Sequence, residues 1–118
     1  MMGPTRPDEG ERVDCWDVAT LEVTPHQPVV LRSDDHGRAI AITLPAGELL
    51  QEHQTHEAAH LAVLGGRVEI VQPTGQATSG GPGLFAHFQP AERREVRALE
   101  ESRLLLLLTP WPGVGHHT

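Results

Sequence analysis

Turn-forming residues punctuate this sequence about every ten residues, and this rhythm limits the fold more than any other feature. Gly, Pro, Asp and Ser cluster near positions 35, 46, 66, 74, 81 and 91. An interval of this length holds one short strand and a turn, so the pattern favours an all-β sandwich or barrel. The chain has 118 residues, the length of a single domain.

Between the turns, apolar residues alternate with others as they do in strands. The clearest case is 38–44, where Ile40, Ile42 and Leu44 fall on one face. A mixed segment from Trp16 to Val23 allows an edge strand. We expect further strands at roughly 28–32, 38–44, 59–64, 67–71, 84–88, 94–99 and 103–108. The domain then spans 16–110, between a flexible N-terminal arm (1–15) and a flexible tail (111–118).

One segment has a second interpretation. Residues 48–64 are rich in good helix formers, with Pro45 before them and Gly65 after them. On propensity alone they form an amphipathic helix. Such a helix would place His53, His56 and His60 on one face.

Composition excludes several classes of function. The chain has 16 acidic residues and nine basic ones, a net charge of −7, so it repels the phosphates of nucleic acids. The longest apolar run, Leu104 to Leu108, is far too short to span a membrane. A single cysteine, Cys15, and an N-terminus without an apolar signal segment indicate a cytoplasmic protein.

The spacing around Gly47 resembles the first motif of the cupins. Gly47, His53 and Gly66 lie in the motif's register, while Thr55 and Ala59 stand at its second His and its Glu. In the second motif Pro90 matches, Glu92 replaces a Gly, and Arg94 or Glu95 replaces the final His. The resemblance covers about residues 28–110.

The resemblance implies one domain with a double-stranded β-helix, a jelly-roll barrel of the small RmlC-like cupins. It overrides the helix interpretation of 48–64, because cupins have two strands and a loop there. It also implies a pocket inside the barrel for a small-molecule ligand. We expect an apolar lining that includes Ile40, Ile42, Val63, Phe85 and Leu106.

Histidines near the motif positions predict a rearranged metal site with His53, His56, His60 and His87 as ligands. Imidazole nitrogens would suit divalent Zn, Fe, Ni or Mn. In the cupin register His53 points inward. Strict alternation turns His60 outward unless the strand shifts by one residue, and His87 is expected to face inward together with Phe85. The alternative is that the degenerate motif binds no metal.

Arg94 also has two interpretations. At the position of the lost His its guanidinium would hold a substrate carboxylate, whereas in the charged run 92–95 it would be a solvated surface residue.

Two classes of function therefore stay open. One is a metal-dependent enzyme similar to dioxygenase or isomerase cupins, and the other is a metal-free binding or regulatory module; enzyme status and substrate are undetermined. A homodimer is expected, because Leu104–Leu108 is apolar on both faces and only one face of a barrel strand meets its own core.

Overall fold

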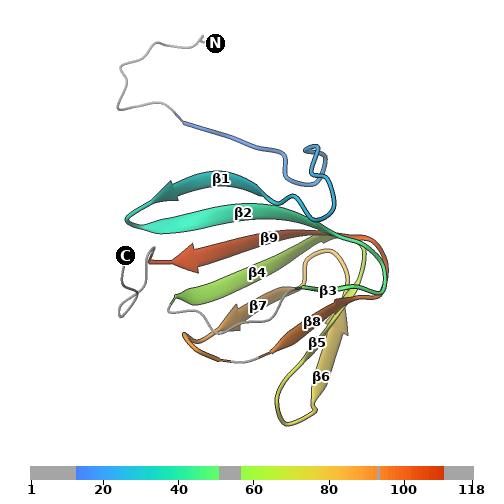
Figure 1. Cartoon of the computed structure of the whole chain (residues 1–118). Helices are drawn as coiled ribbons and strands as arrows, with labels where there is room; N and C mark the ends of the chain where they lie inside the picture. The colour runs from blue at the N-terminus through green and yellow to red at the C-terminus, as the bar shows by residue number, and fades with distance from the viewer. Residues whose placement is uncertain (1–12, 51–56, 93, 111–118) are drawn as a thin grey trace.

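A computed structural model describes residues 13–50, 57–92 and 94–110 of the chain. The described residues form strands and turns and contain no helix (Figure 1). All seven expected strands are present, most of them within one or two residues of the expected bounds. The strands are β1 (Val29–Asp34), β2 (Gly37–Leu44), β3 (Leu49–Leu50), β4 (Ala58–Gly65), β5 (Val68–Val71), β6 (Ala77–Gly80), β7 (Phe85–Phe88), β8 (Glu95–Ala98) and β9 (Ser102–Thr109).

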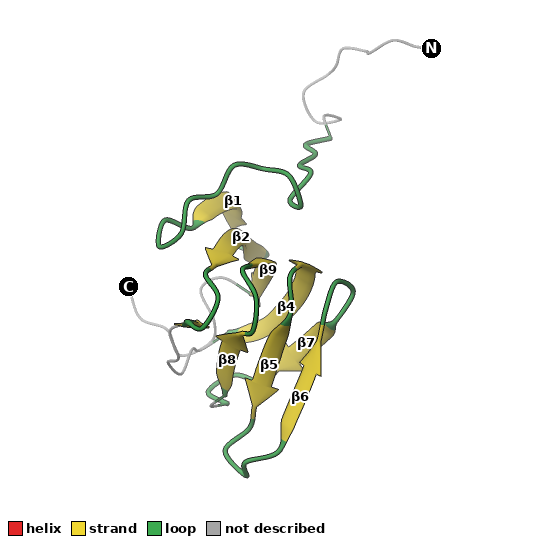
Figure 2. Cartoon of the chain, turned by 90° about the vertical axis from the view of Figure 1, so that its right-hand side faces the viewer, coloured by secondary structure: helices red, strands yellow, loops and turns green. Residues whose placement is uncertain are grey.

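The strands make two antiparallel sheets (Figure 2). The larger sheet has the order β1-β2-β9-β4-β7 and the smaller one the order β3-β8-β5-β6. The last strand, β9, lies between β2 and β4 and pairs with both along most of its length. Strands from opposite ends of the chain are thus neighbours, which confirms the all-β jelly-roll architecture.

The core lies between the two sheets, and in β4, β5 and β8 it follows from the alternation of buried and less buried residues. In β4, Ala59, Leu61 and Val63 are each 1% exposed, while the residues between them are half-buried. Of the expected pocket lining, Ile40, Ile42, Val63 and Leu106 belong to this core or pack against it. Each fully buried Leu or Val contributes about 1.5–3 kcal/mol to folding. Across the core, the buried residues of β4 belong to the same cluster as Val68, Ile70, Val96 and Ala98 of the smaller sheet.

Within 48–64 the strands predicted from the cupin resemblance are confirmed in the described residues, and the helix favoured by propensity alone is not observed. In the described parts of 48–64 the chain forms β3 and β4 instead of a helix, because Ala59, Leu61 and Val63 bury one face in the core. Residues 16–23 form a turn and irregular chain, not an edge strand.

A tight turn at Gly66 joins β4 to β5 and touches the start of β9. Gly66 has φ +82°, and a Cβ there would collide with the carbonyl oxygen of Glu101 and with Oγ of Ser102. Ser102 is buried, and its Oγ accepts a hydrogen bond from the Arg67 amide at 3.1 Å. The motif glycine found in the sequence is therefore required both by backbone conformation and by a close approach.

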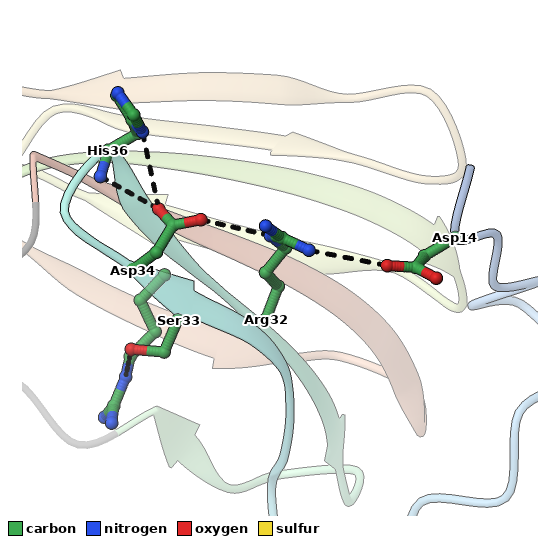
Figure 3. Close-up of polar contacts among 6 residues, drawn as sticks. Asp14, Arg32, Ser33, Asp34 and His36 are labelled. Atoms are coloured by element: carbon green, nitrogen blue, oxygen red, sulfur yellow. Dashed lines mark hydrogen bonds and ion pairs between the residues drawn. The ribbon is translucent and has the colours of Figure 1, made fainter. Parts of the chain in front are cut away.

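The β1–β2 hairpin closes through the Asp34 carboxylate (Figure 3). The backbone amide of His36 donates to Asp34 Oδ1 at 2.9 Å, and Arg32 Nε donates to Oδ2 at 3.1 Å. These interactions, above all the His36 amide, lower the pKa of Asp34 below its usual value of 3.8. The Asp34 side chain thus accepts a hydrogen bond from a backbone amide within the turn.

The segment before β1 is attached to the larger sheet by Arg103. Its guanidinium donates to the carbonyl oxygens of Val18 and Leu21, each at 2.6 Å, and to Thr43 Oγ1 at 3.1 Å. Most of the predicted arm (1–15) and the whole predicted tail (111–118) lie outside the described residues. Within the described residues, no helix is long and apolar enough to cross a membrane.

Candidate functional site

A cavity of about 150 Å³ lies between the two sheets, beside β7. Its wall combines apolar and polar side chains from both sheets in equal number, and its charged lining residues are Glu92 and Arg94. The apolar lining residues are Ile70, Leu84, Phe85, Ala86 and Phe88, and the other polar ones are Gln72, Thr78 and His87. Polar groups placed beside apolar side chains in a cavity are typical of a small-molecule site.

Arg94 is held against this cavity by the ring of Phe88. The guanidinium carbon lies 4.5 Å from the ring centroid, in a cation–π contact. Arg94 Nη1 also lies 3.5 Å from the carbonyl oxygen of Glu92. Because Phe88 is only 7% exposed and belongs to the core, it provides a fixed support. Arg94 is therefore half-buried and lines the cavity, rather than extending into solvent.

Glu92, the other charged lining residue, closes the turn between β7 and β8. Its Oε1 accepts a hydrogen bond from the Gln89 amide at 2.7 Å, and its own amide donates to the Gln89 carbonyl at 3.1 Å. This turn contains Pro90, the residue that matches the second cupin motif. The carboxylate thus shapes the chain immediately before Arg94.

Glu57 is a buried carboxylate, although its polar sequence neighbourhood is typical of a solvated loop. It precedes β4, is 2% exposed, and has the same phase as the core residues Ala59 and Leu61. Burying a charged group is costly, so such positions are uncommon in ordinary cores. The available signal was this period-2 phase, which extends the buried face of β4 by one more residue.

Of the four predicted metal ligands, the structure describes only His60 and His87, and these two lie outside the barrel core. His53 and His56 lie outside the described residues. His60 is opposite His87 in the β4–β7 pair, and both project from the outer face of the larger sheet, away from the core. The inward orientation expected for His87 and Phe85 is wrong: Ala86 and Phe88 take the inward positions, and Phe85 is 62% exposed.

A metal centre inside the barrel cannot be built from the described donors. No three His, Cys, Asp or Glu side chains in this part of the chain are grouped as metal ligands would be. Among the described carboxylates, Glu57 is buried and has the same alternation phase as the inward-facing residues of β4. The sequence neighbours that would complete a set, His53 and His56, fall in the undescribed segment.

The remaining described histidines, His26 and His36, are surface residues. His26 Nε2 lies 2.8 Å from Glu48 Oε1, and the His26 side chain is largely exposed. The side chain of His36 is 96% exposed in the β1–β2 turn.

Comparison with known proteins identifies the fold. No protein-family model matches the chain, and no curated protein matches it. Among solved structures, a double-stranded β-helix protein from Klebsiella pneumoniae superposes with a TM-score of 0.75 at 15% identity, over 94% of this chain and 95% of that one.

Two further structures extend the comparison. An RmlC-like cupin from Desulfovibrio desulfuricans gives a TM-score of 0.72 at 16% identity, over 84% of this chain and 98% of that one. The KdgF protein from Halomonas gives 0.64 at 20% identity, over 76% and 85%. The chain is therefore a cupin in fold, with the double-stranded β-helix of the RmlC-like proteins.

Proposed function

We propose that this cupin binds a small carboxylate in the cavity between its sheets, with Arg94 holding the anion. The observation that carries the proposal is the position of the Arg94 guanidinium, stacked on Phe88 beside a cavity lined by both apolar and polar side chains. A guanidinium offers five N–H donors in a planar fork that matches a carboxylate. The stacking limits the freedom that Arg94 would lose when a ligand binds.

The cavity also limits the size of the ligand. Its volume of about 150 Å³ is below the roughly 300–1,000 Å³ of sites for drug-sized molecules. Ile70, Leu84 and Ala86 would contact the apolar part of such a ligand, and Thr78 adds a hydroxyl. A short aliphatic or aromatic acid fits this combination of size and lining.

Titration with short carboxylates tests the proposal. Acetate, butyrate and benzoate are added to the full chain, each beside its neutral amide, and binding is followed by NMR shifts of pocket residues. We expect the acids to bind more tightly than the amides. Arg94→Ala should weaken acid binding at least about tenfold, a change of about 1.4 kcal/mol. Arg94→Lys should restore part of the loss, because a lysine keeps the charge but not the fork.

Arg97→Ala is the matched control. Arg97 is an exposed arginine on β8, three residues from Arg94, and it is absent from the cavity lining. Its loss changes the net charge equally and should leave acid binding unchanged. Equal weakening by both substitutions, or equal binding of acids and amides, would contradict the role of Arg94.

A divalent metal inside the barrel is a second candidate function, and the buried Glu57 favours it. This carboxylate is in phase with the inner face of β4 and directly follows His56 in sequence. Metal analysis of the untagged protein tests this candidate. One ion per chain that is lost in His53→Ala would support a barrel site. A protein without metal, or with metal unaffected by His53→Ala, would exclude this candidate and leave carboxylate binding as the proposed function.

A further inference from the structure

His60 and His87 lie side by side on the outer face of the larger sheet, and His87, at the edge strand β7, also borders the candidate cavity. They are directly opposite each other in the β4–β7 pair, and their ring centroids are 4.8 Å apart. Two imidazoles bound to one Zn²⁺ at a tetrahedral angle have centroids about 5 Å apart, given Zn–N bonds of about 2.0 Å. The pair is therefore spaced as two ligands of a single ion.

The surroundings of the pair favour contact with another protein surface. Phe85, 62% exposed, stacks on His60 with ring centroids 6.0 Å apart. Leu107, opposite His60 on β9, and Leu105 lie on the same face and are only half-buried. An exposed aromatic ring beside apolar residues is typical of an interaction site.

Charge indicates which partner this face accepts. The chain carries 16 acidic residues and a net charge of −7, yet β2, β4, β7 and β9 contain no Asp or Glu. Two copies of an acidic protein repel each other over most orientations. At this face they can approach without opposing carboxylates from these strands.

We propose that His60 and His87 form half of a zinc site that a second copy of this chain completes. One chain supplies two nitrogens, whereas structural zinc takes four ligands in a tetrahedron. A two-fold axis through the ion supplies the same two side chains from the second copy. Phe85 and the half-buried leucines of β9 then pack across the interface around the metal. This inference does not depend on carboxylate binding in the pocket.

Sedimentation of the untagged full chain tests the site. In chelator we expect a monomer, and with added Zn²⁺ a dimer that contains one ion per two chains. His60→Ala and His87→Ala should each remain monomeric with zinc and lose this ion. Because both residues are on the surface, circular dichroism should show an unchanged β fold in both variants.

His36→Ala is the control, since it removes an exposed histidine from a turn far from β7 in sequence. It should dimerise with zinc as the unmodified chain does. A dimer that persists in chelator and in both variants would overturn the proposal, and so would zinc that binds without a change in mass. An ion that is lost in His53→Ala but kept in His60→Ala and His87→Ala would belong to the barrel, and would also overturn it.

Discussion

At the scale of single residues, Asp34 connects hairpin geometry to pH. Its pKa is lowered in the folded protein by the His36 amide and by Arg32. A lowered folded pKa means that the ionised form stabilises the fold above the unfolded pKa, and that this contribution is lost as pH falls through the folded value. Asp34→Asn keeps an acceptor for the amide but no charge. We therefore expect its melting temperature to lie slightly below that of the unmodified chain at neutral pH, and the two to converge below about pH 4.

Thermal melts between acidic and neutral pH measure this difference. Asp35→Asn is the matched control, because it removes the same charge from the next residue of the same turn, which is also exposed. A gap for Asp34→Asn that does not change with pH, or one that Asp35→Asn reproduces, would show that net charge and not the hairpin contact is responsible.

At the scale of elements, the Gly66 turn determines how β4 and β5 meet the start of β9. Gly66→Ala should lower the free energy of unfolding by about 4 kcal/mol or prevent folding, since it combines a left-handed backbone conformation with a collision at Glu101 and Ser102. Gly75→Ala separates the two causes. Gly75 has φ +92°, but an added Cβ there meets no described atom within 4 Å.

Urea denaturation of the two variants measures both terms. Gly75→Ala should cost only the conformational term, about 1–2 kcal/mol. Equal losses in the two variants would mean that the close approach of Gly66 to the start of β9 does not contribute.

The same scale shows how far sequence predicted this protein. Strands β2, β4 and β9 were placed closely, because each is a run of apolar residues bounded by turn-forming residues, and β4 also alternates in burial. The short strands β3 and β6 were missed, since Leu49–Leu50 is too brief for a pattern and Ala77–Gly80 is largely exposed. In β7 the phase was wrong: Phe85 and Phe88 put an aromatic ring in each phase, so alternation alone could not choose between them.

The site was predictable to a smaller extent. Arg94 was found only because it occupies a family position, and its support on Phe88 depends on the β7 phase that the sequence left undetermined. The burial of Glu57 was not predicted, because this residue ends a polar segment that is typical of a solvated loop. His60 and His87 were two of the four histidines predicted as metal ligands inside the barrel. Their position on the outer face follows from strand pairing between β4 and β7, which the sequence pattern of either strand does not contain.

At the scale of the whole molecule, Arg103 joins the N-terminal segment to the barrel. Its hydrogen bonds to the Val18 and Leu21 carbonyls hold this segment against the larger sheet, where Val23 and Ala41 are buried. Arg103→Met keeps the apolar stem but removes the donors. We expect faster amide hydrogen exchange over residues 18–23 and a loss of about 2 kcal/mol in unfolding free energy, because hydrogen bonds to a charged group are lost.

Exchange in the core strands should show whether the effect stays local. Amides of β4 and β5 should retain their order of protection in Arg103→Met, since the segment can detach while the two sheets stay packed. Arg97→Met, on the exposed face of β8, controls for loss of an arginine charge and should leave residues 18–23 protected. Unchanged exchange at 18–23 in Arg103→Met would mean that burial of Val23, and not the guanidinium, attaches the segment to the barrel.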